Sequence, residues 1–394
     1  MKSHVFKTLK FSLCIILILS LCGCWNSREL DTLGIIMGIA IDKPDEAGKV
    51  QVTAQMVKPG EIKASKKDSG GGSGGEAFWN VTDTGETIFS TLRNMTNQSS
   101  RKLFFPHNQV LLLGWDIAKD GVQEYVDFFE RDPESRDNVM VLIARDKGKE
   151  VLGVKSELEK YPASNIAKLV KGEAAATSET GAVKLREFET RLMSSTTAPV
   201  APIIEISEEG DKKVAKISGT AVFKGDKLIG ELDKKEGRGL LWALGKVKSG
   251  IIVAKDSGNQ TVSMETIRAK GKILPEIKNG KVTIKIDIFE EGNIGEQSGS
   301  KKLFKLSEIA YLEKQKSAVI KGEVTAAVKK AQELETDVFG FGDAIHQKYP
   351  KQWKELEGKW DKVFPEIQVK VNVDAKLRLM GRIFVPTVPE KGKK

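Results

Sequence analysis

The sequence predicts an α+β protein made of three mixed α/β domains in series, each a β-sheet with packed helices, with a long helix in the third domain. Three observations support this fold class. Strand-length apolar runs alternate with helical patterns from residue 34 to residue 193, and a shorter series of strands and one helix follows. A long hairpin pattern then precedes a helical pattern of about 30 residues. The length of 394 residues fits two or three domains.

Domain boundaries are expected where the pattern or the composition changes. Residues 194–202 contain two prolines and are expected to form a linker. The predicted divisions are a lipoprotein signal peptide (1–23), an N-terminal α+β domain (24–198), a small middle α+β domain (199–256), a C-terminal α+β domain with the long helix (257–388) and a tail (389–394).

The first domain is expected to open with a hairpin of strands at 34–42 and 49–56. Residues 58–76 hold a Gly-rich run and are expected to form a flexible surface loop. Asp83 or Thr84 is expected to cap the helix that follows. The remaining elements predicted here are a helix with Ile88, Leu92 and Met95 on one face, buried strands at 109–113 and 139–143, and helices at 122–129, 156–170 and 183–193.

The rest of the chain continues with alternating strands and helices. The middle domain is expected to hold strands at 216–223, 228–232 and 250–254 and a helix at 236–245. In the third domain, Asn279-Gly280 is a strong type I′ turn signal between two strand patterns. A long helix is predicted from Ser307, a break at 337–343, and a final strand at 367–373.

Charge and cysteine content exclude several classes of protein. The 63 basic and 54 acidic residues are interspersed, and their formal net charge of +9 is mild for this length. Removal of a leader with three lysines would leave 60 basic and 54 acidic residues, or +6, which argues against a dedicated nucleic-acid binder. All three cysteines lie within the first 24 residues. The body therefore offers no cysteine nucleophile, disulfide or Cys/His zinc pattern, and no cofactor is expected.

The N-terminus has the features of a lipoprotein leader. Three lysines precede an apolar run at 13–21 that is too short to span a bilayer. The run ends in Leu21-Cys22-Gly23-Cys24, which resembles a bacterial lipobox and predicts lipidation of Cys24. An ordinary cleaved signal peptide and a short membrane anchor are the alternatives. Two acyl chains, at about 0.8 kcal/mol per buried CH₂, would hold the protein stably on the outer face of the cytoplasmic membrane.

Several stretches spread along the chain carry a family resemblance. They are Cys24–Leu33 leading into Gly38–Asp42, Arg101–His107 leading into Gly114, Asp127–Asp132, Ser218–Phe223 leading into Arg238, Gly239 and Trp242, and Phe339–Gly342 through Tyr349, Pro350, Trp353, Trp360 and Phe364. Each stretch alone is weak evidence, but together they are collinear and specific. With them the chain resembles the C subunits of bacterial spore germinant receptors, the Ger(x)C lipoproteins. The Gly-rich run and Cys22 in the lipobox are modest departures from the family pattern.

The resemblance implies a location and partners. It implies three α+β domains in series, anchored at the spore inner membrane. It also implies assembly with two integral membrane subunits: an A subunit with large soluble parts and a B subunit that looks like an amino-acid transporter. The complex senses nutrients and starts germination. The family supplies no catalytic residues, so none can be transferred to this chain.

Individual polar residues give weak signals for other chemistry. His107 and His346 are isolated, and two histidines without cysteine do not form a metal site. Ser99–Lys102 matches SxxK but lacks the accompanying elements of a penicillin-binding site. The run Arg131–Asp137 is more typical of a solvated loop with internal Arg–Asp pairs than of a cation site. Phe339–Gly342 is expected to bury both rings around glycine turns.

Three functions remain open at the level of sequence. The favoured one is an anchored, non-catalytic interaction subunit whose partner contacts include Trp25, Arg28 and Glu29, with Trp25 at the lipid interface. The second is a lipoprotein that captures a nutrient and delivers it to the transporter-like subunit. The third is an extracytoplasmic hydrolase that acts on cell wall, which the acidic residues alone do not exclude.

Overall fold

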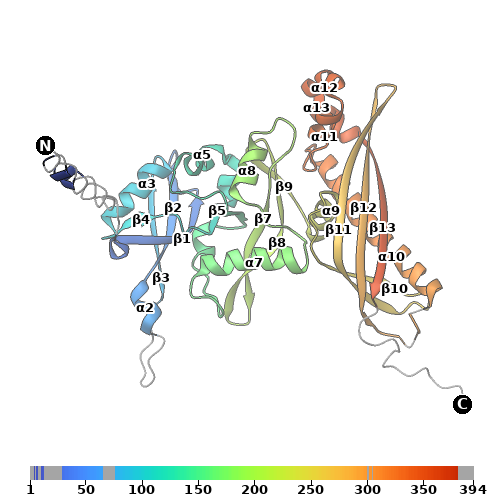
Figure 1. Cartoon of the computed structure of the whole chain (residues 1–394), viewed down its shortest axis with the longest axis horizontal. Helices are drawn as coiled ribbons and strands as arrows, with labels where there is room; N and C mark the ends of the chain where they lie inside the picture. Colours follow the sequence, from blue (N-terminus) through green and yellow to red (C-terminus); the bar gives the residue numbers. More distant parts are fainter. Residues whose placement is uncertain are drawn as a thin grey trace, which may run out of the picture.

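The computed structural model describes residues 29–64, 76–299, 301–303 and 305–379, together with residues 4, 6, 7 and 10–12 near the N-terminus. Within these residues the protein has a multi-domain α+β fold with two sheets that lie side by side (Figure 1). The larger sheet has the strand order β3-β2-β1-β5-β6-β7-β8-β9, with β4 paired to β1, and the smaller has the order β10-β11-β12-β13.

The larger sheet is parallel at its centre and antiparallel at its edges. Strands β1, β5, β6 and β7 run parallel, whereas β2 and β3 on one side and β8 and β9 on the other are antiparallel to their neighbours. The strands are β1 (Leu33–Asp42), β2 (Val50–Val57), β3 (Phe78–Gly85), β4 (Lys102–Phe104), β5 (Val110–Gly114), β6 (Met140–Ala144), β7 (Val200–Glu209), β8 (Lys212–Lys224) and β9 (Lys227–Leu232).

Helices cover both faces of this sheet. One face packs on α3, α4, α5 and α8, and the other packs on α6 and α7. Because the central strands are covered on both sides, β5 and β6 are buried at every position, which explains their uninterrupted apolar sequences. The helical segments are η1 (Leu30–Thr32), α2 (Pro59–Ala64), α3 (Ile88–Asn94), η2 (Met95–Asn97), α4 (Trp115–Asp120), α5 (Gln123–Arg131), α6 (Gly148–Val151), α7 (Pro162–Ala176), α8 (Leu185–Leu192) and α9 (Lys234–Ala243).

Several expectations for this region need correction. Residues 78–85 form strand β3, and the cap of α3 is Thr87, whose side chain accepts a hydrogen bond from the Ser90 N–H at 3.1 Å, so the caps predicted at Asp83 and Thr84 are wrong. The predicted loop at 58–76 begins with the short helix α2, and its residues 65–75 lie outside the described residues. The sheet also runs across the expected boundary at 198/199, because β7, β8 and β9 continue it.

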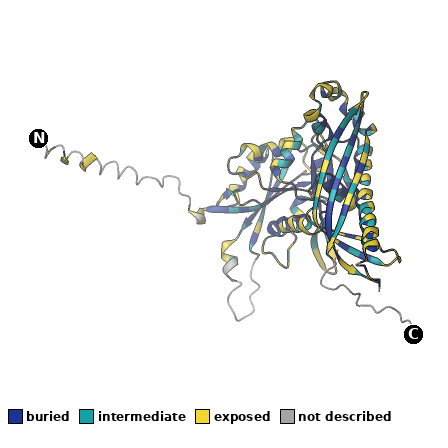
Figure 2. Cartoon of the chain, turned by 45° about the vertical axis from the view of Figure 1, so that its right-hand side comes forward, coloured by how far each residue is buried: buried dark blue, intermediate teal, exposed yellow. Residues whose placement is uncertain are grey.

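The smaller sheet is built on a long hairpin. Its elements are β10 (Ile251–Lys255), β11 (Thr261–Lys278), β12 (Lys281–Gln297), α10 (Leu306–Glu333), α11 (Phe341–Lys348), α12 (Pro350–Leu356), η3 (Glu357–Lys359), α13 (Trp360–Val363), η4 (Phe364–Glu366) and β13 (Gln368–Leu379). The turn at Asn279 and Gly280 has φ of 51° and 74°, as a type I′ turn requires. Strand β12 alternates as predicted, with Ile284 and Ile286 buried, and the outward side of the long helix beside the sheet is exposed (Figure 2).

The segment between α10 and α11 ties the two sheets together. Phe339 and Phe341 are buried with stacked rings 5.0 Å apart, and Gly340 has φ of 77°, which confirms the packing prediction. The Ala198 N–H, just before β7, donates to the Asp337 carbonyl at 2.8 Å. A backbone hydrogen bond therefore joins the segment before β7 of the larger sheet to the segment between α10 and α11.

A second junction lies between α9 and α10. The Arg238 guanidinium donates to the Glu323 carboxylate, and the Trp242 indole N–H donates to the same carboxylate at 2.8 Å. Gly239 lies so close to α10 that an added Cβ would stand 2.2 Å from the Glu323 carbonyl oxygen.

Among the described residues, no helix combines the length and the apolarity that a membrane crossing requires.

Candidate interaction groove

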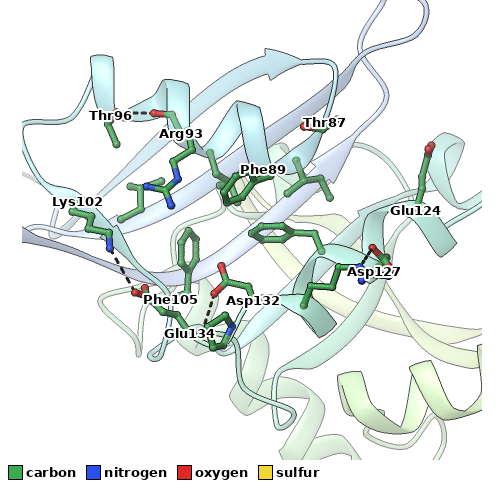
Figure 3. Close-up of a pocket in the computed structure, with 16 residues that line it drawn as sticks. Thr87, Phe89, Arg93, Thr96, Lys102, Phe105, Glu124, Asp127, Asp132 and Glu134 are labelled. Atoms are coloured by element: carbon green, nitrogen blue, oxygen red, sulfur yellow. Dashed lines mark hydrogen bonds and ion pairs between the residues drawn. The ribbon is translucent and has the colours of Figure 1, made fainter.

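An aromatic groove of about 630 Å³ is lined by residues of α3, β4 and α5. In the larger-sheet unit, α3 and β4 lie on the side away from the smaller sheet (Figure 1). The walls of the groove are α3 on one side and α5 on the other, and its floor is β4 with the residues that follow it. The rings of Phe89 and Phe105 line the groove (Figure 3), as does Phe128, whose ring lies 6.0 Å from that of Phe89. Two of the stretches that carry the family resemblance, Arg101–His107 and Asp127–Asp132, therefore converge here although they are distant along the chain.

Helix α3 presents an aromatic ring to the groove because of how its apolar residues are spaced. Ile88 and Leu92 lie four residues apart and are buried on the same face. Phe89 is turned away from that face and is 55% exposed, with its ring 6.0 Å from the ring of Phe128. An exposed ring of this size, beside a second aromatic ring, favours contact with an apolar partner.

Helix α5 is amphipathic and supplies the opposite wall. Val126 and Phe129 are buried beneath it, and Phe128 is half-buried at the groove. Arg131 donates to both carboxylate oxygens of Asp127, at 2.7 and 3.0 Å. This pairing holds the pKa of Asp127 below its usual range and that of Arg131 above its own.

The charges around the groove are mixed in sign. Four acidic and three basic side chains line it. Lys102 lies 3.6 Å from a carboxylate oxygen of Glu134. Arg93 instead stacks over the Phe89 ring, 5.1 Å from its centroid, and has no carboxylate partner among the described residues. Glu124 interacts with the Tyr125 hydroxyl and has no cationic partner in the same set. Burial raises the pKa of the Tyr125 hydroxyl, and the hydrogen bond to the negatively charged Glu124 raises it further.

The groove has the composition of a contact surface. Aromatic rings occupy its centre, and its ionic groups lie at the rim, largely paired with one another (Figure 3). No group of three or more His, Cys, Asp or Glu side chains that could hold a metal ion occurs in the described part of the chain. The arrangement offers apolar contact area with a charged border, which is the usual composition of a protein–protein contact surface.

Most of the residues predicted from the sequence to contact partners are not among the residues that the structure describes. Cys24, Trp25 and Arg28 fall outside the described residues. Glu29 has an exposed position, and its carbonyl accepts hydrogen bonds from the Thr32 N–H at 3.1 Å and the Thr32 hydroxyl at 2.7 Å. Four residues later β1 begins, and it pairs in parallel with β4 at the groove floor.

The other polar candidates take structural positions. His107 is exposed and lies beside the Phe104 ring, and His346 is exposed and stacks on Trp353. The Ser99 hydroxyl donates to the carbonyl of Arg101. In the run Arg131–Asp137, Arg131 pairs with Asp127, Glu134 with Lys102 and Asp137 with Arg186, so each of these ion pairs uses a residue from outside the run.

The prediction from sequence did not identify Phe89 and Arg93. Ile88 and Leu92 define the buried face of this helix, so an adjacent Phe89 had to lie off that face. Arg93 lies four residues after Phe89, at the spacing that brings two side chains together on a helix surface. An aromatic and a basic residue at this spacing on the outer face were the available signal.

Comparison with known sequences identifies the class of protein. Residues 26–206 match the family described as "Spore germination protein N-terminal domain". Residues 218–381 match the family described as "Spore germination B3/ GerAC like, C-terminal". The two matches together cover most of the chain, which belongs to the Ger(x)C family of spore germination proteins.

Individual relatives span nearly the whole chain. Spore germination protein KC of Bacillus subtilis (strain 168) is 28% identical over 400 residues, which cover 96% of this chain and 97% of the relative. Spore germination protein B3 of the same strain is 26% identical over 381 residues, covering 95% and 98%. The crystal structure of the GerBC protein aligns with a TM-score of 0.57 at 21% identity over 86% of this chain and 96% of that chain, which supports the multi-domain α+β fold.

Proposed function

We propose that this protein is a lipid-anchored C subunit of a nutrient germinant receptor, required for spore germination in response to nutrients. Lipidated Cys24 holds it on the outer face of the cytoplasmic membrane, the spore inner membrane. It acts as a non-catalytic interaction subunit with membrane A and B subunits. The role in germination is supported by relatives that are named as spore germination proteins and aligned from end to end.

The observation that carries the interaction role is the aromatic groove beside the start of β1. Strand β4, at the groove floor, pairs with Leu33, and Leu33 follows Cys24 by only nine positions. At about 3.5 Å per residue, the intervening chain reaches at most about 32 Å. A lipid on Cys24 would thus keep the groove near the bilayer and near any integral partner.

The shape of the groove favours a macromolecular partner over a small nutrient. Sites for small molecules enclose most of the ligand surface and place a few polar groups around it. Here Phe89 is 55% exposed at the groove, and two of the basic groups, Lys102 and Arg131, already have carboxylate partners. Nutrient capture and delivery is therefore the less favoured function.

The lipid anchor is tested by cysteine substitution. Cys24→Ala removes the acylated side chain, so we expect the protein to leave the membrane fraction and nutrient-triggered loss of spore optical density to fail. Cys22→Ala is the matched control, because Cys22 belongs to the leader and is removed. Membrane retention and normal germination of the Cys24→Ala strain would contradict the proposal.

A further inference from the structure

The two sides of the aromatic groove carry opposite charges that have no ionic partner among the described residues. Arg93, from α3, lies on one side of Phe89, and Glu124, from α5, lies on the other side, toward the opposite end of the groove (Figure 3). The remaining rim charges are already engaged. Lys102 pairs with Glu134, Arg131 pairs with Asp127, and the Asp132 carboxylate accepts the Glu134 N–H at 2.8 Å.

We propose that this groove receives an amphipathic helix of an integral membrane partner, with apolar side chains over the phenylalanines, an acidic side chain opposite Arg93 and a basic side chain opposite Glu124. The inference rests on the proposed function and adds to it the place and the chemistry of the contact. Each end charge would gain a partner on docking, and a helix in the reverse orientation would face like charges, so the charges set orientation as well as affinity.

A helix fits the groove because of what the groove presents. Its centre offers ring faces and edges, so an occupant must satisfy its own backbone hydrogen bonds. A helix does so internally, and projects side chains at positions i, i+3, i+4 and i+7 along one face. A volume of about 630 Å³ holds a few such side chains. An integral membrane partner crosses the bilayer with elements whose backbone hydrogen bonds are formed within the protein, and a helix is one such element.

The alternative occupant of an aromatic groove near a membrane is the lipid surface itself. Anionic lipid is attracted by clustered lysine and arginine. Here four acidic side chains stand among three basic ones, and of these basic groups only Arg93 has no carboxylate partner in the described part of the chain. Approach to an anionic surface would bring Glu124 and Asp132 toward like charge, so the charge pattern favours a protein partner over the bilayer.

The contact is tested in the assembled complex with a photoreactive residue. Phe89 is replaced by a benzophenone-bearing phenylalanine in the full-length protein, expressed in the spores and irradiated in their membranes. We expect crosslinks to one membrane subunit at partner positions spaced three and four residues apart. The matched control carries the same group at Leu158, which is 90% exposed and outside the groove, and is expected to give no such crosslink.

Charge variants test the orientation. Arg93→Glu and Glu124→Lys should each reduce co-purification of the membrane subunit about tenfold or more, the loss expected for a central contact. Arg93→Lys should retain most of it, and Arg186→Glu, an exposed charge on α8, should have no effect. The variants should keep the melting temperature of the unlipidated chain, because the Arg93 and Glu124 side chains lie at the surface.

The outcomes separate this inference from the proposed function. If the wild-type complex co-purifies but crosslinks from position 89 reach only lipid, or partner residues spaced by two, the helix inference is wrong and the receptor role stands. Binding of unlipidated protein to vesicles of neutral and anionic phospholipid that is lost on Phe89→Ala would likewise overturn it in favour of a lipid contact. If the wild-type chain co-purifies with no membrane subunit, the proposed function itself fails.

Discussion

Asp337 organises the turn between α10 and α11 with one buried carboxylate. Its oxygens accept hydrogen bonds from the N–H groups of Phe339, Gly340 and Gly342, at 3.2, 2.8 and 2.8 Å. Burial nevertheless raises the pKa of Asp337 to about 6, and the N–H donors only partly offset it. The folded state therefore binds this proton more tightly than the unfolded state, and the stability that it contributes is lost as the pH rises through 6.

This shift predicts a pH-dependent difference between the wild type and Asp337→Asn. The neutral amide cannot accept all three N–H donors, so the variant should be less stable at pH 5 by about 1–3 kcal/mol. Between pH 5 and pH 8 the wild type should lose about 1 kcal/mol relative to the variant, because only the wild type must ionise a buried group. Urea unfolding at several pH values measures this difference. A gap that stays constant or widens with pH would contradict it.

Glu29 gives a prediction about assembly rather than stability. Its side chain is exposed, and the hydrogen bonds that Glu29 forms with the described residues run from Thr32 to its backbone carbonyl. Charge reversal at Glu29 or at Arg28 should weaken co-purification of the receptor subunits, while the melting temperature of the unlipidated chain changes by less than about 1 °C. Unfolding of the chain by either reversal would show that these residues are structural.

At the scale of elements, the crossing of α9 and α10 depends on a missing side chain. An alanine Cβ at Gly239 would stand 2.2 Å from a backbone oxygen of Glu323, which cannot move without displacing α10. Gly239→Ala should therefore destabilise the protein by about 2 kcal/mol or more. Gly322→Ala on α10 is the matched control, because its Cβ meets open space, and it should stabilise by up to about 1 kcal/mol. Thermal unfolding of both variants decides the point, and equal effects would contradict it.

The elements that sequence predicts well are those defined by local pattern. The hairpin at Asn279-Gly280, the buried strands β5 and β6 and the long helix α10 follow directly from turn chemistry and periodicity. Strand β3 was missed because only Phe78 and Val81 of its eight residues are fully buried, which leaves no clear alternation. The addition of β7, β8 and β9 to the first sheet depends on pairing between distant segments, which local pattern does not encode.

The groove also could not be predicted from local sequence pattern, because distant segments form it. Its walls come from residues 87–96, 102–105 and 124–134, and no single segment has the composition of a binding site.

The ion pair between Lys316 of α10 and Glu290 of β12 is a second feature that the sequence alone does not predict. Both side chains are completely buried, 2.7 Å apart, although lysine in a helix is normally exposed. Only the packing of α10 on β12 brings the two charges together.

At the scale of the whole molecule, α3 and β4, which line the groove, lie on the far side of the larger sheet from the smaller sheet (Figure 1). The chain enters the fold beside the groove, where β1 and β4 pair. The junctions at Gly239 and Asp337 connect the larger sheet to the smaller one through close packing and hydrogen bonds. If Cys24 carries the proposed lipid, this arrangement keeps the groove closer to the membrane than the smaller sheet is.

A crosslinking map of the intact membrane complex tests this account most directly. An amine-reactive crosslinker applied to spore membranes would report which lysines of this chain lie near the integral subunits. We expect crosslinks to concentrate at the groove, for example at Lys102, and to be sparse on the smaller sheet, for example at Lys278 and Lys281. Crosslinks that cluster on the smaller sheet and spare the groove would contradict the account.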